Sequence, residues 1–375
     1  MYDVLLSVII SFTITFFAIP AIMTVAERKK LFDIPDERKI HQTPIPSLGG
    51  LGIFAGFVLA CLIVIPFQIA PEFQYFFAAA IVIFFLGLKD DILVISPIKK
   101  FIGQVIAAFL IIYKGGIQID SMHGFMGIYE LPEMFSLILT YFTVIVIINS
   151  FNLIDGIDGL AGTFGVMACV LLGLYFLQVN YTGYSILAFS MAGSTAAFLI
   201  FNFQPAKIFM GDTGSMLIGM VLSILVIKFI DISQLNSISF PVNASPAIGF
   251  TILMVPLLDT LRVFAIRMYH RRSPFSPDRN HVHHLLLDRG LSHRAITVLL
   301  ASINFFFVLA VFSFRNTVGC TWLIISIIAI FFAGIAALYI GRPQPRLFVA
   351  KTSEKEHPTT KIVTLTKDTI LEHKN

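Results

Sequence analysis

Long apolar runs recur along almost the whole chain, and they constrain its fold more than any other feature. A helix needs roughly 20 apolar residues to cross about 30 Å of hydrocarbon. Eleven runs approach this length; those at 74–89 and 102–116 are the shortest. Only 13% of the residues are charged, against about 25% in soluble domains. We therefore expect an all-α, polytopic integral membrane protein with about eleven transmembrane helices. The runs lie at about 4–25, 48–68, 74–89, 102–116, 134–151, 159–178, 184–201, 214–230, 246–266, 296–314 and 321–341.

The basic residues predict how these spans are oriented. If all eleven runs cross the membrane, successive loops alternate between its two sides. One side then receives 22 of the 26 Lys and Arg residues, and basic loops mark the cytoplasmic side. We expect an N-terminus outside and a cytoplasmic C-terminus. The membrane domain is predicted over 1–341, followed by a polar cytoplasmic tail over 342–375 with no function assigned.

The unusual polar residues fall almost entirely in the predicted cytoplasmic loops. A transporter would be expected to place ionisable residues near mid-bilayer, on broken helices. The gathering of acids at one membrane face instead favours an enzyme that takes one substrate from water and another from lipid. An ion or anion transporter is the rival class. The loop segments are DERKIHQTPIPSLGG (36–50), KDDILVISPIKK (89–100), NLIDGIDG (152–159), NFQPAKIFMGDTGS (202–215) and RRSPFSPDRNHVHH (271–284).

Two of these segments carry acids at spacings that suit a shared site. Asp90 and Asp91 are adjacent, and close carboxylates repel unless a cation or a proton intervenes. Asn152, Asp155 and Asp158 are each three apart, so a helix would place all three along one face. The plainer alternatives are a solvated helix end for the first pair and a capping turn for the second group.

The last two segments add a further acid and a set of bases. Asp212 and Ser215 precede an apolar run, which would equally fit a simple helix N-cap. His281, His283 and His284 lie among arginines without cysteine partners or HExxH spacing, so a phosphate-binding patch is favoured over zinc. Plain positive-inside charge would explain the arginines but not the histidines. Carboxylates, an amide and bases together suit a magnesium-bound pyrophosphate.

The order of these motifs closely resembles the polyprenyl-phosphate N-acetylhexosamine-1-phosphate transferases, of the glycosyltransferase family 4 type. The resemblance covers about residues 1–340 and rests on DD, NLIDGIDGLAG, NFQPAKIFMGDTGS and PDRNHVHH. The form PDRNHVHHLL is similar to the branch that transfers GlcNAc-1-phosphate to undecaprenyl phosphate. The branch that uses UDP-MurNAc-pentapeptide carries a contiguous HHH followed by Phe-Glu, and it stays the alternative within the family.

Two other families of membrane enzymes fit less well. The segment DDILV lacks the third acid of the DDxxD motif of aromatic prenyltransferases, and DGIDGLA lacks the arginine of the DGxxAR motif of CDP-alcohol phosphotransferases.

The resemblance also implies an activity and a place in the cell. It implies transfer of GlcNAc-1-phosphate (or a related HexNAc-1-phosphate) from a UDP-sugar to undecaprenyl phosphate, with release of UMP, initiating cell-envelope glycan synthesis. The cofactor implied is Mg²⁺, with Mn²⁺ as a substitute. The protein would lie in the bacterial cytoplasmic (inner) membrane with its active site on the cytoplasmic face. A homodimer is expected, and no nucleic-acid partner.

The resemblance assigns roles to individual residues as well. Asp90 would orient or deprotonate the lipid phosphate, Asp91 would be its partner near the metal, and the ring of Phe209 would stack on uracil. The implied residues are, as catalytic acids, Asp90, Asp91, Asp155 and Asp158; as metal ligands, Asp212 and Asn152; and as substrate-binding residues, Lys39, Lys100, Asn202, Phe209, Arg279, His281, His283 and His284.

Overall fold

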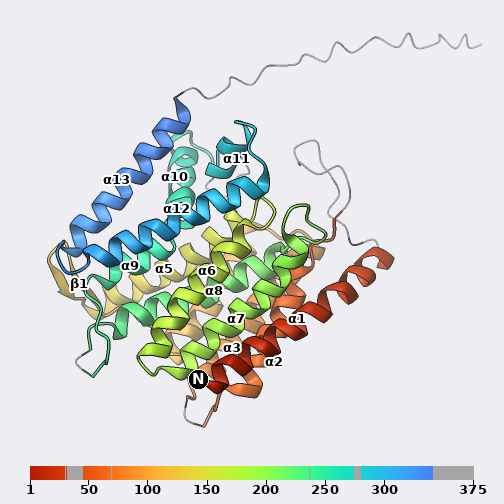
Figure 1. Cartoon of the computed structure of the whole chain (residues 1–375), viewed down its shortest axis with the longest axis horizontal. Coiled ribbons are helices and arrows are strands. Elements are labelled where there is room, and N and C mark those ends of the chain that lie inside the picture. Colours follow the sequence, from red (N-terminus) through yellow and green to blue (C-terminus); the bar gives the residue numbers. More distant parts are fainter. Residues whose placement is uncertain (30, 32–44, 69, 236, 274–279, 341–375) are drawn as a thin grey trace, which may run out of the picture. The chain divides into compact units, whose positions relative to one another are not determined.

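The structure is a computed structural model that describes residues 1–29, 31, 45–68, 70–235, 237–273 and 280–340. The predicted tail and two of the predicted substrate-binding residues, Lys39 and Arg279, lie outside this part. The described part is mostly helical (Figure 1). The helices are α1 (Tyr2–Lys29), α2 (Gly49–Val64), α3 (Phe73–Ile92), α4 (Pro97–Phe109) with the π-helical turn η1 (Leu110–Lys114), α5 (Glu133–Ile154), α6 (Leu160–Gln178), α7 (Thr182–Asn202), α8 (Gly211–Ile232), α9 (Ser245–Ile252), α10 (Met254–Tyr269), α11 (Val282–Leu287), α12 (His293–Phe314) and α13 (Cys320–Tyr339).

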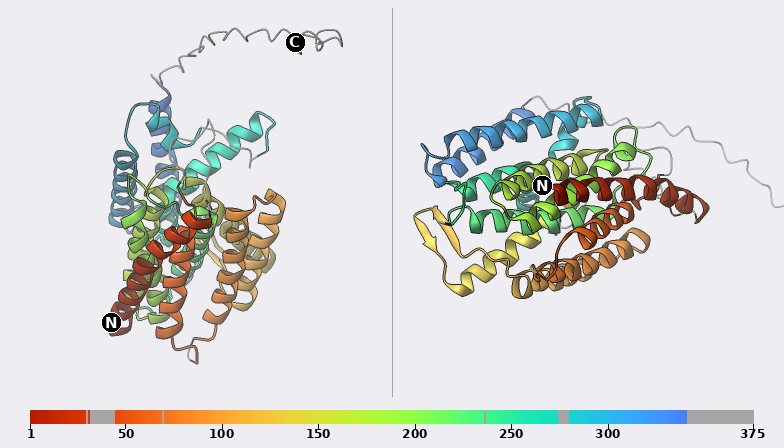
Figure 2. Two further views of the ribbon diagram at one scale, coloured as in Figure 1. Left: turned by 90° about the vertical axis from the view of Figure 1, so that its right-hand side faces the viewer. Right: turned by 60° about the horizontal axis from the view of Figure 1, so that its bottom comes forward.

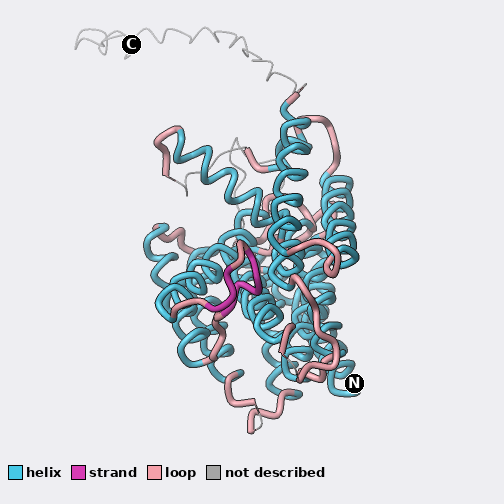
Figure 3. The backbone as a smooth tube through the Cα atoms, turned by 90° about the vertical axis from the view of Figure 1, so that its left-hand side faces the viewer, coloured by secondary structure: helices cyan, strands magenta, loops and turns pink. Residues whose placement is uncertain are grey.

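A small antiparallel hairpin is the one departure from the all-α prediction within the described residues. Strands β1 (Ser121–Phe125) and β2 (Ile128–Glu130) pair in the connection between η1 and α5 (Figure 3). Gly124 and Gly127 have positive φ, the backbone conformation that a tight reversal needs and that glycine adopts without strain.

The apolar runs of the sequence correspond to the helices. Seven helices of the described part are long and apolar enough to cross a membrane, and an eighth span is possible if α9 and α10 form one broken span. Helix α2 is apolar but has only 16 residues. A polytopic membrane architecture is therefore confirmed, whereas the count of eleven and the orientation of the termini stay predictions.

The run expected as a single ninth span is broken in the structure. Helices α9 and α10 meet at an angle of 76°. Pro256, in the first turn of α10, has no N–H to donate. The buried side chain of Asn304 serves the freed backbone groups instead: its Nδ2 donates to the carbonyl of Ile252 (3.1 Å) and its Oδ1 accepts from the N–H of Val255 (3.3 Å). Broken helices occur in membranes only where such groups find partners.

Helix α8 lies at the centre of the bundle and is buried along nearly its whole length. It packs against α2, α3, α5, α6, α7 and α9, and the views in Figure 2 show the helices that surround it. Small residues allow the closest approaches. A Cβ at Gly87 would lie 2.5 Å from the Cα of Thr213, and one at Gly219 would lie 2.7 Å from the Cα of Ile148. The end of α3 is thereby brought against the start of α8.

Candidate active site

The amino end of α8 is held by a carboxylate from another helix. Asp91, at the end of α3, accepts hydrogen bonds from the N–H groups of Asp212 (2.7 Å) and Thr213 (3.1 Å) and from the Thr213 hydroxyl (2.5 Å). The first N–H groups of a helix have no partner within it, so Asp91, which belongs to α3, acts as the N-cap of α8. Gly211 has a φ of +71°, and a Cβ there would overlap the carbonyl of Ser47. Both oxygens of Asp91 thus fix the backbone that carries Asp212.

Residues 45–50, the end of the first predicted cytoplasmic loop, also lie beside the amino end of α8. The N–H groups of Gly49 and Gly50 donate to the carbonyls of Phe209 (2.9 Å) and Met210 (2.8 Å), and the N–H of Phe209 donates to the carbonyl of Pro46 (2.8 Å). The segment IPSLGG therefore runs along FMGD, and it fixes the backbone of Phe209. The ring of Phe209 is partly buried, and its stacking on uracil stays a prediction.

Four helices bring one polar side chain each to a common cluster. Lys100 from α4 lies between Asp90 of α3 and Asp212 of α8: its Nζ is 2.7 Å from Asp90 Oδ2 and also forms a short ion pair with Asp212 Oδ2. Asn152 of α5 donates from Nδ2 to Asp212 Oδ1 (2.9 Å) and to the hydroxyl of Ser215 (3.1 Å). Four of the residues selected from the sequence are therefore in contact, and we call Asp90, Lys100, Asn152 and Asp212 the acid cluster.

The NLIDGIDG segment is not a continuous helix, so the helical arrangement that would place its three polar residues on one face does not form. Helix α5 ends at Ile154, Asn152 lies in its last turn and Asp155 is its C-cap. Burial raises the pKa of Asp155 to about 8, and the charges of nearby carboxylates, first that of Asp212, add to the shift. Asp155 therefore lies close enough to the acid cluster to feel its charge.

Asp158 turns away from the acid cluster and binds other loops. It is buried, with one carboxylate oxygen 3.3 Å from Nδ1 of His293 and the other accepting from the N–H of Ala206 (3.2 Å). Its carbonyl accepts from the hydroxyl of Thr297 (3.1 Å). These contacts join the turn after α5 to α12 and to the loop before α8, so Asp158 holds the shape of the site.

Asn202 has a similar holding role. It is 3% exposed. Its Nδ2 donates to the carbonyl of Ile208, and its Oδ1 accepts from the N–H of Gly159, both at 2.9 Å. Both ends of the amide are thus used to tie the turn after α5 to the loop that leads to α8. A contact of Asn202 with substrate stays a prediction.

Residues 280–283, which lead into and begin α11 and which we call the histidine loop, are anchored by a residue that was not selected from the sequence. Asp259 of α10 accepts from the N–H of Val282 (3.0 Å) and pairs through its other oxygen with Nδ1 of His281 (2.8 Å). Arg262 is 2.7 Å from Asp259 and also donates to the carbonyl of Asn280. The signal was available, because an acid and an arginine three positions apart in an apolar run are rare and usually functional.

His283 brings this loop against the turn after α5. It is buried, and a Cβ on Gly156 would overlap its Nε2. Its ring stacks on that of His281 at a centroid distance of 5.6 Å. Burial lowers the pKa of His283 to about 3, so this side chain is uncharged at neutral pH. His283 can thus add hydrogen bonding but not positive charge to the predicted phosphate-binding patch.

The acid cluster fits a divalent cation that is completed by substrate. In the described part, no group of three or more His, Cys, Asp or Glu residues could by itself hold a metal ion. The carboxylates of Asp90 and Asp212 nevertheless lie close enough to share Lys100, and the amide of Asn152 contacts Asp212 through Nδ2. Mg²⁺ is usually bound by one or two carboxylates together with substrate phosphates. The pKa of Asp155 is raised mainly by burial and further by the charges of nearby carboxylates, and a bound cation would offset those charges.

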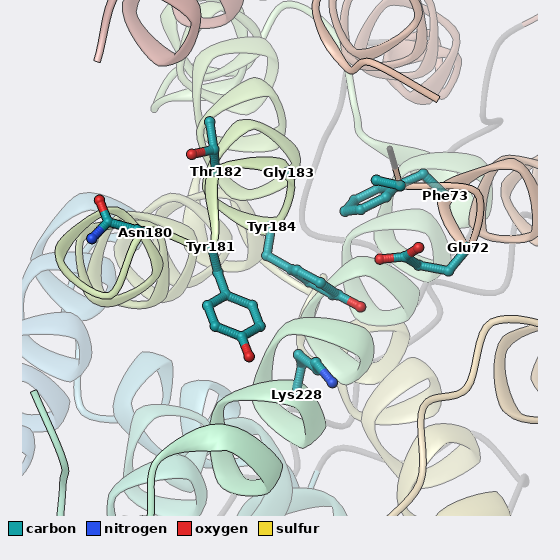
Figure 4. A pocket seen from close by; sticks show the side chains of 9 residues that line it. Glu72, Phe73, Asn180, Tyr181, Thr182, Gly183, Tyr184 and Lys228 are labelled. Carbon is teal, nitrogen blue, oxygen red and sulfur yellow. The ribbon is translucent and has the colours of Figure 1, made fainter. Parts of the chain in front are cut away.

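A separate cavity of about 290 Å³ lies near the other end of α3 (Figure 4). Its lining includes Glu72, Tyr184 and Lys228, and the Lys228 Nζ is 5.8 Å from the Tyr184 ring centroid and 2.8 Å from Asp231. Helix α3 has 20 residues between this cavity and the acid cluster, a rise of about 30 Å. The two sites are therefore distinct.

Comparison with known proteins places the chain in a family. Residues 73–230, from α3 to near the end of α8, match the family model described as glycosyl transferase family 4. A Bacillus subtilis (strain 168) protein named probable undecaprenyl-phosphate N-acetylglucosaminyl 1-phosphate transferase is 32% identical over 342 residues, which cover 90% of this chain and 92% of the relative.

Two further relatives agree with this assignment. A decaprenyl-phosphate N-acetylglucosaminephosphotransferase of Mycobacterium tuberculosis (strain ATCC 25618 / H37Rv) is 31% identical over 76% of both chains. An undecaprenyl-phosphate alpha-N-acetylglucosaminyl 1-phosphate transferase of Yersinia pestis is 30% identical over 74% of both chains. The chain belongs to the polyprenyl-phosphate N-acetylhexosamine-1-phosphate transferases of glycosyl transferase family 4.

Proposed function

We propose that this protein catalyses the Mg²⁺-dependent transfer of GlcNAc-1-phosphate from UDP-GlcNAc to undecaprenyl phosphate, releasing UMP at the cytoplasmic face of a bacterial inner membrane. The observation that carries the proposal is the convergence of Asp90, Lys100, Asn152 and Asp212 from four helices. The relatives are named as transferases of N-acetylglucosamine phosphate to undecaprenyl or decaprenyl phosphate, and these names support the choice of acceptor and sugar. A homodimer stays a prediction from the family resemblance.

The reaction must bring two anionic groups together. At 4 Å, two unit charges repel by about 4 kcal/mol at an effective dielectric constant of 20. A bound Mg²⁺, held by Asp212 and Asn152, would supply charge that stabilises the transferring phosphoryl group. Lys100 would offset a further part of the repulsion. In this proposal the lipid phosphate oxygen forms a bond to the β-phosphorus while the bond from that phosphorus to the bridging oxygen breaks, and UMP leaves with that oxygen.

Asp90 is held in one orientation for its part in this step. One of its oxygens accepts from the N–H of Ile95 (2.7 Å), and the other faces Lys100. The second pKa of a phosphate monoester is about 6, so the nucleophile is largely ionised at pH 7 and needs no strong base. Asp90 would therefore orient the lipid phosphate and accept its last proton. Trapping a phosphorylated enzyme without lipid acceptor would instead support a two-step route through an aspartyl intermediate.

The proposal is tested with purified protein in detergent, Mg²⁺ and undecaprenyl phosphate. We expect UMP release from UDP-GlcNAc that is lost in Asp212→Ala and retained in Asp231→Asn, a control whose side chain pairs with Lys228 of the distant cavity. Release only from UDP-MurNAc-pentapeptide would assign the protein to the other branch of the family, and release only from UDP-GalNAc would change the sugar. Release from none of the three by folded protein would overturn the proposal.

A further inference from the structure

A buried ion pair lies beneath the histidine loop, outside the acid cluster. Asp259 is 1% exposed and Arg262 is 6% exposed, and the two side chains are one helical turn apart on α10, at 2.7 Å. Removing two charges from water is costly, and a buried pair is weak support for stability by itself. Ionisable residues within apolar helices are rare and usually have a function. The contacts of the pair indicate which function this is.

Besides a hydrogen bond from Arg262 to the hydroxyl of Tyr339 (3.1 Å), the pair binds three consecutive residues of the histidine loop. Asp259 accepts from the N–H of Val282 (3.0 Å) and binds Nδ1 of His281 (2.8 Å), while Arg262 donates to the carbonyl of Asn280. Backbone and side chain of the loop are therefore held from the same two residues. The position and rotation of the His281 ring are set by Asp259.

This contact leaves one nitrogen of His281 for another group. Because a carboxylate accepts from Nδ1, the proton stays on Nδ1 and Nε2 is available for a ligand. The ring lies parallel to that of His283, with 6° between the planes. His283 in turn contacts Gly156, beside Asp155. The His281 ring thus stacks on His283, and His283 in turn packs against the acidic turn after α5.

We propose that Asp259, supported by Arg262, is a positioning residue that holds His281 so that its unprotonated Nε2 accepts a hydrogen bond from a hydroxyl or N–H group of the nucleotide sugar. This inference rests on the proposed function, because it assigns Asp259 a part in binding the donor. Asp259 itself does not touch substrate and acts through His281. An asparagine at position 259 could turn its NH₂ group toward Nδ1, which would move the ring proton to Nε2.

The test compares Asp259→Asn, His281→Asn and the double variant in the UMP-release assay. For Asp259→Asn we expect a raised KM for UDP-GlcNAc, an unchanged KM for undecaprenyl phosphate and a loss in kcat/KM of about 10–100-fold, as is typical when an orienting partner is removed. His281→Asn should show the same pattern. The double variant should be no worse than His281→Asn alone, because the two residues act as one unit. Asp231→Asn is the matched control and should behave as wild type.

The alternative outcomes are distinct. A loss of apparent kcat with both KM values unchanged would indicate fewer folded molecules and would overturn the inference. Additive losses in the double variant would also overturn it. If Asp259→Asn is not recovered folded, the pair Asp259→Asn with Arg262→Gln removes both buried charges together and carries the same kinetic expectation. Absence of transfer by folded wild-type protein would overturn the proposed function and this inference with it, whereas normal kinetics of Asp259→Asn beside active wild type would overturn the inference alone.

Discussion

The side chain of Asp155 should make the stability of the folded protein depend on pH. Its pKa is raised to about 8 from the ordinary value of 3.8. The folded protein holds this proton more tightly than the unfolded chain does. The resulting stabilisation of the folded state is fully present below the ordinary pKa and is lost as the pH rises through the raised pKa. Metal-free wild-type protein should therefore lose stability progressively between about pH 4 and pH 8 through this group, and the loss should level off above that range.

The expected result is a difference between wild type and Asp155→Asn that depends on pH. In the presence of a chelator, the variant should unfold about 2–4 °C above wild type at pH 9, and the two should approach each other at pH 5. The midpoints can be measured by thermal unfolding in detergent. A constant difference at both pH values would show that Asp155 does not titrate in this range.

Gly156 tests the contact between the acidic turn and the histidine loop. Gly156→Ala would place a Cβ into Nε2 of the buried His283, and an inserted methyl group in a packed site costs about 1–3 kcal/mol. We expect a lower unfolding midpoint and reduced transferase activity. Gly334→Ala is the matched control, because nothing lies within 4 Å of a Cβ there. Equal behaviour of both variants would contradict the close packing of His283 on this turn.

At the scale of an element, the start of α8 depends on a cap from α3. Asp91→Ala should cost about 0.5–2 kcal/mol, the usual effect of removing a cap, and should lower activity because Asp212 lies in the first turn. Asp91→Asn keeps one carbonyl oxygen as an acceptor for the N–H groups of Asp212 and Thr213, so it should retain more of both properties. Unfolding midpoints and UMP release measure the two effects. An Asn variant as inactive as the Ala variant, but with wild-type stability, would instead support a direct role of the Asp91 charge.

The break between α9 and α10 has a consequence for the site. Helix α10 carries Asp259 and Arg262, and its direction after the 76° bend sets where the histidine loop begins. The sequence predicts one straight span here, because an apolar run of this length contains no obvious break apart from Pro256. The bend is stabilised by Asn304 from α12, a partner that local sequence cannot reveal.

For the whole molecule, the predicted orientation places the loop after α3 in the cytoplasm and the loop after α8 outside. Ser96 and Ser237 are exposed in these loops, and the native cysteines are all buried. A membrane-impermeant maleimide added to intact cells should label Ser237→Cys and leave Ser96→Cys unlabelled until the membrane is opened. The reverse pattern would invert the topology, and labelling of both loops from outside would contradict the alternation of the spans between them.

Much of the architecture follows from the sequence alone. Apolar runs must be helical in hydrocarbon because every backbone N–H and carbonyl needs a partner within its own segment. The positions of the helices therefore follow from local composition. The residue types of the site follow too: Asp90, Lys100, Asn152 and Asp212 were selected from the sequence, and they meet in the structure.

Only the tertiary structure showed which of these polar residues contact one another and which contact neighbouring loops. Asp158 and Asn202 carry side chains as suitable for catalysis as those of Asn152 and Asp155, yet they bind backbone groups of neighbouring loops. Asp259 lies in an apolar run but holds the histidine loop. The physical reason is that the partner of a buried polar group is set by how helices distant in sequence pack together. Local sequence determines that such a group needs a partner, and the packing of the helices determines which partner it has.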